Sequence, residues 1–147
     1  MEKVIVKVVN KSKNPLPEYE TSGSAGVDVR ANIDEPITLG SLERKLIPTG
    51  LHVQIPEGYE IQVRPRSGLA LKKGISMVNT PGTIDSDYRG DVGLIIINLS
   101  KDEYTIQPGE RLGQLVLNKV EQIQWEVVEN LSETERGEGG FGHTGKQ

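Results

Sequence analysis

The sequence predicts an all-β fold of the sandwich, barrel or jelly-roll type, with one short helix. Short runs rich in Val, Ile and Leu recur along the 147 residues, and such runs favour strands. The 17 Gly and 8 Pro interrupt these runs, as expected for many short strands joined by turns. Only Leu69–Lys73 is suited to a helical turn, which Gly74 would end.

The strand pattern is clearest after the turn at residues 56–58, where Ile61 and Val63 alternate with polar residues. Residues 94–97 read Leu-Ile-Ile-Ile, so that strand is apolar on both faces. We expect both faces to be covered, as in an oligomer core. The expected strands are Val4–Val9, Val27–Ala31, Ile37–Leu39, Lys45–Pro48, Leu51–Ile55 (after Thr49-Gly50), Tyr59–Val63, Ile75–Val78, Val92–Leu99, Tyr104–Ile106, Leu112–Val120 and Trp125–Val128.

The chain divides into a β domain over residues 1–128 and a C-terminal arm over residues 129–147. The apolar pattern stops at Glu129, and five glycines fall between Gly137 and Gly145. Such a segment is mobile by itself, so a ligand or a neighbouring chain would have to order it.

Composition excludes several function classes. The formal net charge of −4 argues against coating duplex nucleic acid, which requires a broad basic face. The absence of cysteine rules out disulfides and thiolate catalysis. His52 and His143 are too few for a histidine-based zinc site. We expect no signal peptide and no membrane span, and hence a cytoplasmic protein.

The most informative segment is Gly82–Asp91, which reads Gly-Thr-Ile-Asp-Ser-Asp-Tyr-Arg-Gly-Asp. It holds three acids and a tyrosine between two strands. These residue types also favour an ordinary acidic turn. Functionally, the segment offers Asp85 as a carboxylate on a loop, where it could act as a general base.

A second segment, Arg64–Ala70, combines a strand end with a helix start. Backbone N–H groups there, beside Arg66 and the Ser67 hydroxyl, would form an anion pocket. Ordinary helix capping is the simpler interpretation of this segment taken alone.

The glycine-rich tail at residues 136–146 matches a dinucleotide fingerprint and most of a P-loop. Both folds require a following helix, for which residues 146–147 leave no room. Flexible glycine amides can still wrap phosphate oxygens. Phe141, the only Phe, is better placed to stack on a base than to pack in a core. A low-complexity disordered end is the alternative.

Three further residues occupy suggestive positions. Asp28 is the one acid in an apolar strand, either facing outward or holding an active-site arginine. Gln114, in the late strand after Pro108-Gly109, either faces solvent or donates to a phosphate. Asn79 follows the strand Ile75–Val78 and can present both a donor and an acceptor to one base edge.

Taken in order, these segments resemble the five motifs of the trimeric deoxyuridine triphosphatase family, and they span Ala25 to Gly145. The resemblance implies a jelly-roll homotrimer with three active sites between subunits, each closed by a C-terminal arm. It implies hydrolysis of dUTP to dUMP and pyrophosphate, which keeps uracil out of DNA and supplies dUMP for thymidylate synthesis.

The resemblance also implies a role for each matched residue. Asp85 would activate water for attack on the α-phosphorus, and Tyr88 would pack under the deoxyribose. Asp28 would support the site from behind. The remaining residues fall into three groups: Asn79, Thr83 and Ile84 would read uracil; Arg66, Ser67, Gly68 and Gln114 would hold the triphosphate; Arg136, Phe141, Gly142 and Thr144 would form the lid.

Magnesium is the implied cofactor, bound mainly by the substrate phosphates and water, since the sequence shows no dedicated metal cage. Two positions depart from the family. His143 stands where Ser is usual, and Gly93 replaces a larger side chain, so any substrate contact there would be through the backbone.

Two alternatives stay open at this point. A deoxycytidine triphosphate deaminase shares this fold and ligand class, but its chemistry requires a Glu at the cytosine ring, where this sequence offers Asp85. A non-catalytic nucleotide-binding β module would not require a carboxylate beside phosphates.

Overall fold

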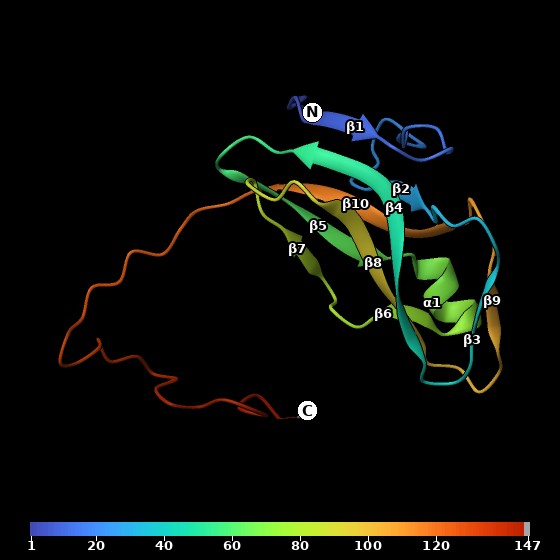
Figure 1. Ribbon diagram of the computed structural model, residues 1–147. Coiled ribbons are helices and arrows are strands. Elements are labelled where there is room, and N and C mark those ends of the chain that lie inside the picture. Colours follow the sequence, from blue (N-terminus) through green and yellow to red (C-terminus); the bar gives the residue numbers. More distant parts are fainter. Residues whose placement is uncertain (146–147) are drawn as a thin grey trace.

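The computed structural model describes residues 1–145 and has ten strands and one helix over that range (Figure 1). The elements follow in chain order: β1 Lys7–Asn10, β2 Val27–Arg30, β3 Ile37–Leu39, β4 Arg44–Gln54, β5 Tyr59–Pro65, α1 Ser67–Lys73, β6 Ile75–Met77, β7 Gly82–Ile84, β8 Asp91–Asn98, β9 Tyr104–Ile106 and β10 Arg111–Lys119. The predicted all-β class with one short helix is confirmed.

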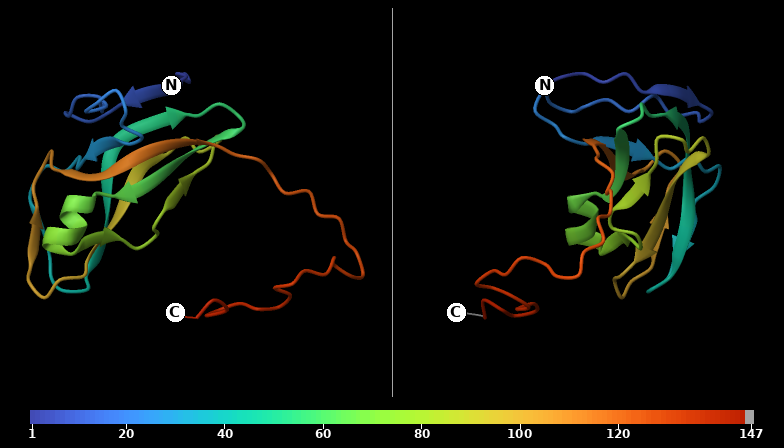
Figure 2. Two further views of the ribbon diagram at one scale, coloured as in Figure 1. Left: turned by 180° about the vertical axis from the view of Figure 1, so that it is seen from behind. Right: turned by 90° about the vertical axis from the view of Figure 1, so that its left-hand side faces the viewer.

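Two four-stranded antiparallel sheets form the body. One has the strand order β1-β4-β8-β6 and the other β2-β10-β5-β7, while β3 and β9 pair as a separate ribbon. The two larger sheets face each other in Figures 1 and 2, and α1 lies at one end of the body beside β6. This is the jelly-roll type of arrangement, in which strands adjacent in a sheet are distant in sequence.

The core lies between the two larger sheets. Side chains of β4, β6, β8 and β10 are almost fully buried there, among them Ile47, Ile75, Leu94, Ile96 and Leu112. Asn98 is also fully buried, and its amide nitrogen donates to the carbonyls of Leu39 at 2.9 Å and Asp102 at 2.8 Å. A buried amide with satisfied hydrogen bonds pins the end of β8 at little energetic cost.

Strand β8 buries only one of its two faces completely within this chain. Leu94 and Ile96 have no exposed surface, whereas Ile95 and Ile97 on the opposite face are partly exposed. We predicted that both faces of this strand are covered. Within the single chain, only one face is.

The separation of residues 45–48 from residues 51–55 was wrong, because both belong to β4. Thr49-Gly50 does not end the strand but forms an irregularity in it, between the pairs Pro48↔Gly93 and His52↔Asp91. Four steps along β4 match two along β8, so β4 contains a bulge. Gly50 adopts a φ of 74° there, a conformation that glycine tolerates well.

Helix α1 begins two residues earlier than predicted and ends as predicted. Gly74 takes the left-handed conformation (φ 67°), and its N–H donates to the carbonyl of Ala70 at 3.1 Å. The capping interpretation of Arg66 and Ser67 was wrong. Arg66 stands at the cap position without a capping side-chain bond, and Ser67 is already helical. Neither side chain therefore caps the helix.

The prediction of a strand at Trp125–Val128 was wrong, because the single chain forms no strand there. The last strand ends at Lys119, and residues 120–145 contain neither helix nor strand. Trp125 and Val127 are 82% and 96% exposed. A strand requires a partner, and this segment leaves the body without one in every view of Figures 1 and 2.

Candidate active site

The loop that contains Asp85 joins β7 to β8 and borders a cavity of about 470 Å³. The Asp85 carbonyl accepts the Tyr88 N–H at 3.2 Å, which closes a turn. Of the predicted site residues, the cavity brings together Asn79, Thr83, Ile84, Asp85 and Tyr88. Its apolar walls come from the adjoining strands, with Leu46, Pro48, Val63, Val92, Gly93 and Ile95. A cavity of this size and lining suits one planar base and its sugar.

Two glycines allow side chains to approach closely at this cavity. A Cβ built on Gly82 would lie 2.8 Å from the Asn79 amide nitrogen, and one built on Gly90 would lie 2.5 Å from Cζ of Tyr88. Real Cβ atoms do not approach so closely, so glycine at both positions is what allows these side chains to lie as they do. Gly93 also borders the cavity, so that any contact it makes with a ligand is through its backbone.

A second concavity, also about 470 Å³, lies at the start of α1. It brings together Arg66, Ser67 and Gln114, three of the predicted phosphate-binding residues. The fourth, Gly68, lies in the first turn of α1 and is exposed. The Gln114 side-chain nitrogen donates to the Pro65 carbonyl at 3.2 Å, which fixes the amide beside the arginine.

Asp28 lies directly behind Arg66. One carboxylate oxygen of Asp28 is 3.4 Å from Arg66 Nε, and the other is 3.6 Å from Arg111 Nη1. Arg111 in turn contacts Glu20 at 2.8 Å. Arg66 also donates to the Arg111 carbonyl at 3.3 Å. A guanidinium constrained at several points presents its remaining N–H groups in a fixed direction, which suits an anion.

The contact of Arg111 with Asp28 was not predicted from the sequence, although Arg111 begins the strand that contains Gln114. Its cross-strand partner is Arg30, so the pairing of β10 with β2 is what brings Arg111 to Asp28. No local sequence pattern predicts such a pairing of distant strands.

Strand β5 separates the two concavities. Val63 faces the cavity that contains Asp85, whereas its neighbours Gln62 and Arg64 face the concavity that contains Ser67. Successive side chains of a strand point to opposite faces of the sheet. The β5 residues that line the two concavities therefore lie on opposite faces of one sheet, while residues 79–82 border both concavities, with Asn79 and Gly82 on one and Thr80 and Pro81 on the other.

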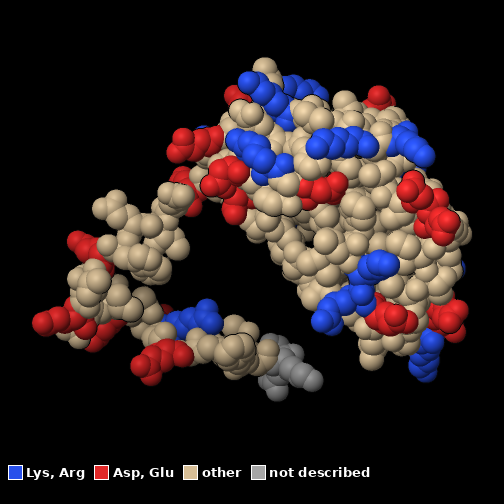
Figure 3. All heavy atoms as spheres, viewed as in Figure 1, with Lys and Arg blue, Asp and Glu red and all other residues tan. Residues whose placement is uncertain are grey.

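The predicted lid residues lie far from both concavities. Residues 129–145 stand apart from the body (Figure 3), and Phe141 is fully exposed. Bonds within the arm include Arg136 Nε to the Gly139 carbonyl at 2.6 Å and His143 N–H to the Gly140 carbonyl at 2.8 Å. Gly142 and Thr144 are exposed in the same segment. Lys146, the end of the P-loop-like match, lies outside the described residues.

Other kinds of site find little support in the part of the chain that the structure describes. Residues 1–145 contain no group of three His, Cys, Asp or Glu side chains arranged to bind a metal ion. Over the same range, α1 is too short and not apolar enough to cross a membrane. Acidic and basic side chains are interspersed on the face shown in Figure 3.

Comparison with known proteins gives a consistent result. The sequence model of the dUTPase family matches residues 12–145. A deoxyuridine 5'-triphosphate nucleotidohydrolase of Fusobacterium nucleatum is 68% identical over 146 residues, covering 99% of this chain and 100% of that protein. The protein of the same name from Finegoldia magna is 59% identical, covering 95% of this chain and 98% of its own length.

Solved structures resemble the fold closely. A mutant dUTPase of Staphylococcus bacteriophage 80alpha, in complex with dUpNHpp, has a TM-score of 0.88 at 28% identity and covers 97% of this chain and 99% of its own. A mutant dUTPase from phage phi11 of S. aureus, described as revealing the coordination of a structural Mg(II) ion, has a TM-score of 0.79 at 25% identity. It covers 88% of this chain and 100% of its own.

Proposed function

Because this chain belongs to the dUTPase family, we propose that it hydrolyses dUTP to dUMP and pyrophosphate. The observation that carries the proposal is the cavity in which Asp85 lies beside Asn79 and Tyr88. A loop carboxylate next to a cavity of nucleoside size offers a base close to where the α-phosphate would enter. The exposed Asp85 side chain also has access to the water that the reaction consumes.

In the proposed mechanism, Asp85 accepts a proton from a water molecule as that water attacks the α-phosphorus. The bond between the α-phosphorus and its bridging oxygen breaks, and pyrophosphate leaves with the electron pair. Phosphoryl chemistry of this kind depends mainly on positioning and charge neutralisation. Tyr88 would support the deoxyribose, while Asn79 and the backbone of Thr83 and Ile84 would read uracil.

Arg66, Ser67, Gly68 and Gln114 would bind the triphosphate, with Asp28 orienting Arg66. Magnesium would arrive with the triphosphate as part of the substrate, since Mg²⁺ commonly binds through phosphate oxygens and water. Its contribution there would be to neutralise phosphate charge and fix the conformation of the triphosphate.

The two-sided geometry of β5 supports an active site shared between subunits of a homotrimer. The nucleoside cavity of one chain and the phosphate concavity of the same chain lie on opposite sides of one sheet. We infer that one substrate engages both kinds of residue by taking them from different chains. On the partly exposed face of β8, Ile95 borders the nucleoside cavity, and Ile97 is an apolar side chain that trimer formation would bury.

The arm would complete the site. Phe141 is fully exposed and Arg136 lies near it in sequence, which suits a segment that becomes ordered only over bound substrate. Phe141 would then stack on uracil, while Arg136, Gly142 and Thr144 would contact phosphates.

A product assay tests this proposal directly. The protein is incubated with dUTP and, separately, with each of the four common deoxynucleoside triphosphates, with and without Mg²⁺. We expect pyrophosphate from dUTP alone, and Asp85→Asn should abolish turnover while dUpNHpp still binds. Ammonia release from dCTP, or normal turnover by Asp85→Asn, would contradict the proposal.

Hybrid trimers test the sharing of sites. Asp85→Asn and Arg66→Ala variants, each inactive alone, are mixed, dissociated and reassembled. If the two residues act from different chains, some sites in the hybrids contain both native residues and activity returns. Complete inactivity of hybrids whose mixed composition is verified would mean that each site uses one chain.

A further inference from the structure

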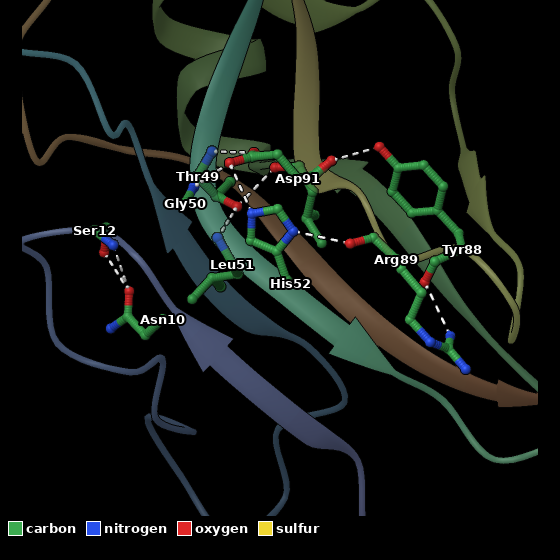
Figure 4. A network of polar contacts seen from close by, with 10 residues as sticks. Asn10, Ser12, Thr49, Gly50, Leu51, His52, Tyr88, Arg89 and Asp91 are labelled. Carbon is green, nitrogen blue, oxygen red and sulfur yellow. Dashed lines mark hydrogen bonds and ion pairs between the residues drawn. The ribbon is translucent and has the colours of Figure 1, made fainter.

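The loop between β7 and β8 is attached to β4 by the side chain of Asp91 (Figure 4). One carboxylate oxygen accepts the Thr49 N–H at 3.1 Å, and the other accepts the Gly50 N–H at 3.0 Å. These two amides belong to the bulge of β4, where the pairing with β8 is interrupted. A single carboxylate therefore supplies acceptors that the neighbouring strand does not.

A second attachment comes from His52. Its Nδ1 lies 2.9 Å from the Arg89 carbonyl oxygen. A carbonyl oxygen can only accept, so Nδ1 must be the protonated nitrogen in this contact. The other ring nitrogen, Nε2, is 3.9 Å from a carboxylate oxygen of Asp91. The imidazole thus bridges the end of the loop and the residue that begins β8.

These attachments reach the predicted site through Tyr88. The Tyr88 hydroxyl donates to the backbone carbonyl of Asp91 at 2.9 Å, so the position of Asp91 sets the direction of the ring that borders the nucleoside cavity. Arg89, held by His52, also stiffens the turn, because its guanidinium donates to the Ser86 carbonyl at 2.6 Å. Figure 4 shows these contacts running from β4 across Asp91 to Tyr88.

We propose that His52 and Asp91 are positioning residues for the reaction at Asp85. Neither side chain has a proposed contact with base or phosphate, although Asp91 borders the nucleoside cavity. Both fix the C-terminal side of the turn that presents Asp85 and Tyr88, at Arg89 and at Asp91 itself. This inference rests on the proposed dUTP hydrolysis. A catalytic carboxylate on an exposed loop must lie within a narrow range of positions to aim a water molecule, and the bulge of β4 provides the rigid support.

The test compares two substitutions at His52. His52→Phe retains a ring but removes the donor, whereas His52→Asn restores an N–H group on the atom attached to Cγ, as Nδ1 is. Gln54→Ala, two residues along the same face of β4, is the matched control. Asp91→Asn is a second variant, in which one of the two acceptors becomes a donor facing the Thr49 or Gly50 amide.

Amide hydrogen exchange without nucleotide measures the attachment itself, independently of any reaction. We expect the amides of residues 85–90 to exchange faster in His52→Phe and in Asp91→Asn, and at the wild-type rate in His52→Asn and Gln54→Ala. If the wild-type protein failed to hydrolyse dUTP, the proposed function would fall, while the exchange result would still decide whether His52 and Asp91 hold the loop.

Steady-state kinetics then measures the consequence. We expect His52→Phe to lower kcat about tenfold, equivalent to about 1.4 kcal/mol of barrier, with KM changed less than about threefold. His52→Asn should recover most of the loss. Wild-type kcat in His52→Phe would overturn the proposal, as would equal losses in the Phe and Asn variants or unchanged loop exchange in both His52→Phe and Asp91→Asn.

Discussion

Replacing Gly90 with alanine should damage activity far more than stability. The new Cβ would lie 2.5 Å from Cζ and 2.9 Å from Cε1 of Tyr88, whereas carbon atoms pack at about 3.5–4.0 Å. The ring must therefore move by roughly 1 Å. The Tyr88 hydroxyl, now 2.9 Å from the Asp91 carbonyl, would then leave hydrogen-bond range.

Two effects on stability nearly cancel. Loss of that hydrogen bond costs about 0.5–1.5 kcal/mol. Alanine returns about 0.4–1 kcal/mol by restricting the unfolded chain, since Gly90 is not among the glycines with positive φ. Activity has no such compensation, because a displacement of about 1 Å in a catalytic site can cost about 100-fold. We expect kcat/KM for dUTP to fall by about 10- to 100-fold, with Tm changed by no more than about 4 °C.

Pyrophosphate release and thermal unfolding, measured on the same preparation, separate these effects. Gly23→Ala is the matched control, because its Cβ would meet nothing within 4 Å, and it should leave both quantities near wild type. The reasoning is refuted if Gly90→Ala keeps kcat/KM within about twofold of wild type, a difference below about 0.5 kcal/mol. It is equally refuted if activity falls only in proportion to a large loss of folded protein.

Three further predictions concern other parts of the molecule. Truncation after Asn130 should leave a folded trimer by light scattering with little dUTP turnover, and full activity would exclude a closing arm. Asp28→Asn should weaken the ion pair that orients Arg66 and lower kcat/KM about tenfold, or about 1.4 kcal/mol, mainly through a higher KM. An unchanged KM would count against a positioning role for Asp28. Burial and the hydrogen bond to Glu110 raise the pKa of Tyr104 above its ordinary value of 10.0. The folded state thus binds this proton more tightly, and the stability it contributes is present below pH 10 and lost as the pH rises further. Tyr104→Phe should flatten the alkaline fall in Tm, and an identical fall in both proteins would contradict this.

Features encoded by neighbouring residues could be predicted from the sequence. The end of α1 at Gly74 follows from one glycine in the left-handed conformation. Tyr59–Val63 and Tyr104–Ile106 are strands close to their predicted limits, because alternation and flanking turns are local signals. The resemblance also selected residues that the fold gathers, such as Asn79, Asp85 and Tyr88 around one cavity.

Features that depend on distant pairing could not be predicted. Thr49-Gly50 has the composition of a turn, but it lies within β4 as a bulge, where the Asp91 carboxylate of β8 accepts both of its backbone N–H groups. Gly82–Ile84 carries too short a pattern to be recognised, yet it forms β7 because Val63 and Ile61 of β5 pair with its ends. In both cases the interacting residue is at least 19 residues away in the sequence.

The error at Trp125–Val128 has a different cause. Residues 123, 125 and 127 are Ile, Trp and Val, alternating with Gln124 and Glu126, which is a sound strand pattern. The three apolar side chains are 73%, 82% and 96% exposed in the single chain. Exposed apolar surface of this extent marks a surface that binds another molecule. The prediction of a strand was therefore wrong for residues 125–128, because a sound alternation does not form a strand where no described strand pairs with it. The proposed trimer makes a related demand at β5, because the shared site that we propose would take its nucleoside residues and its phosphate residues from different chains.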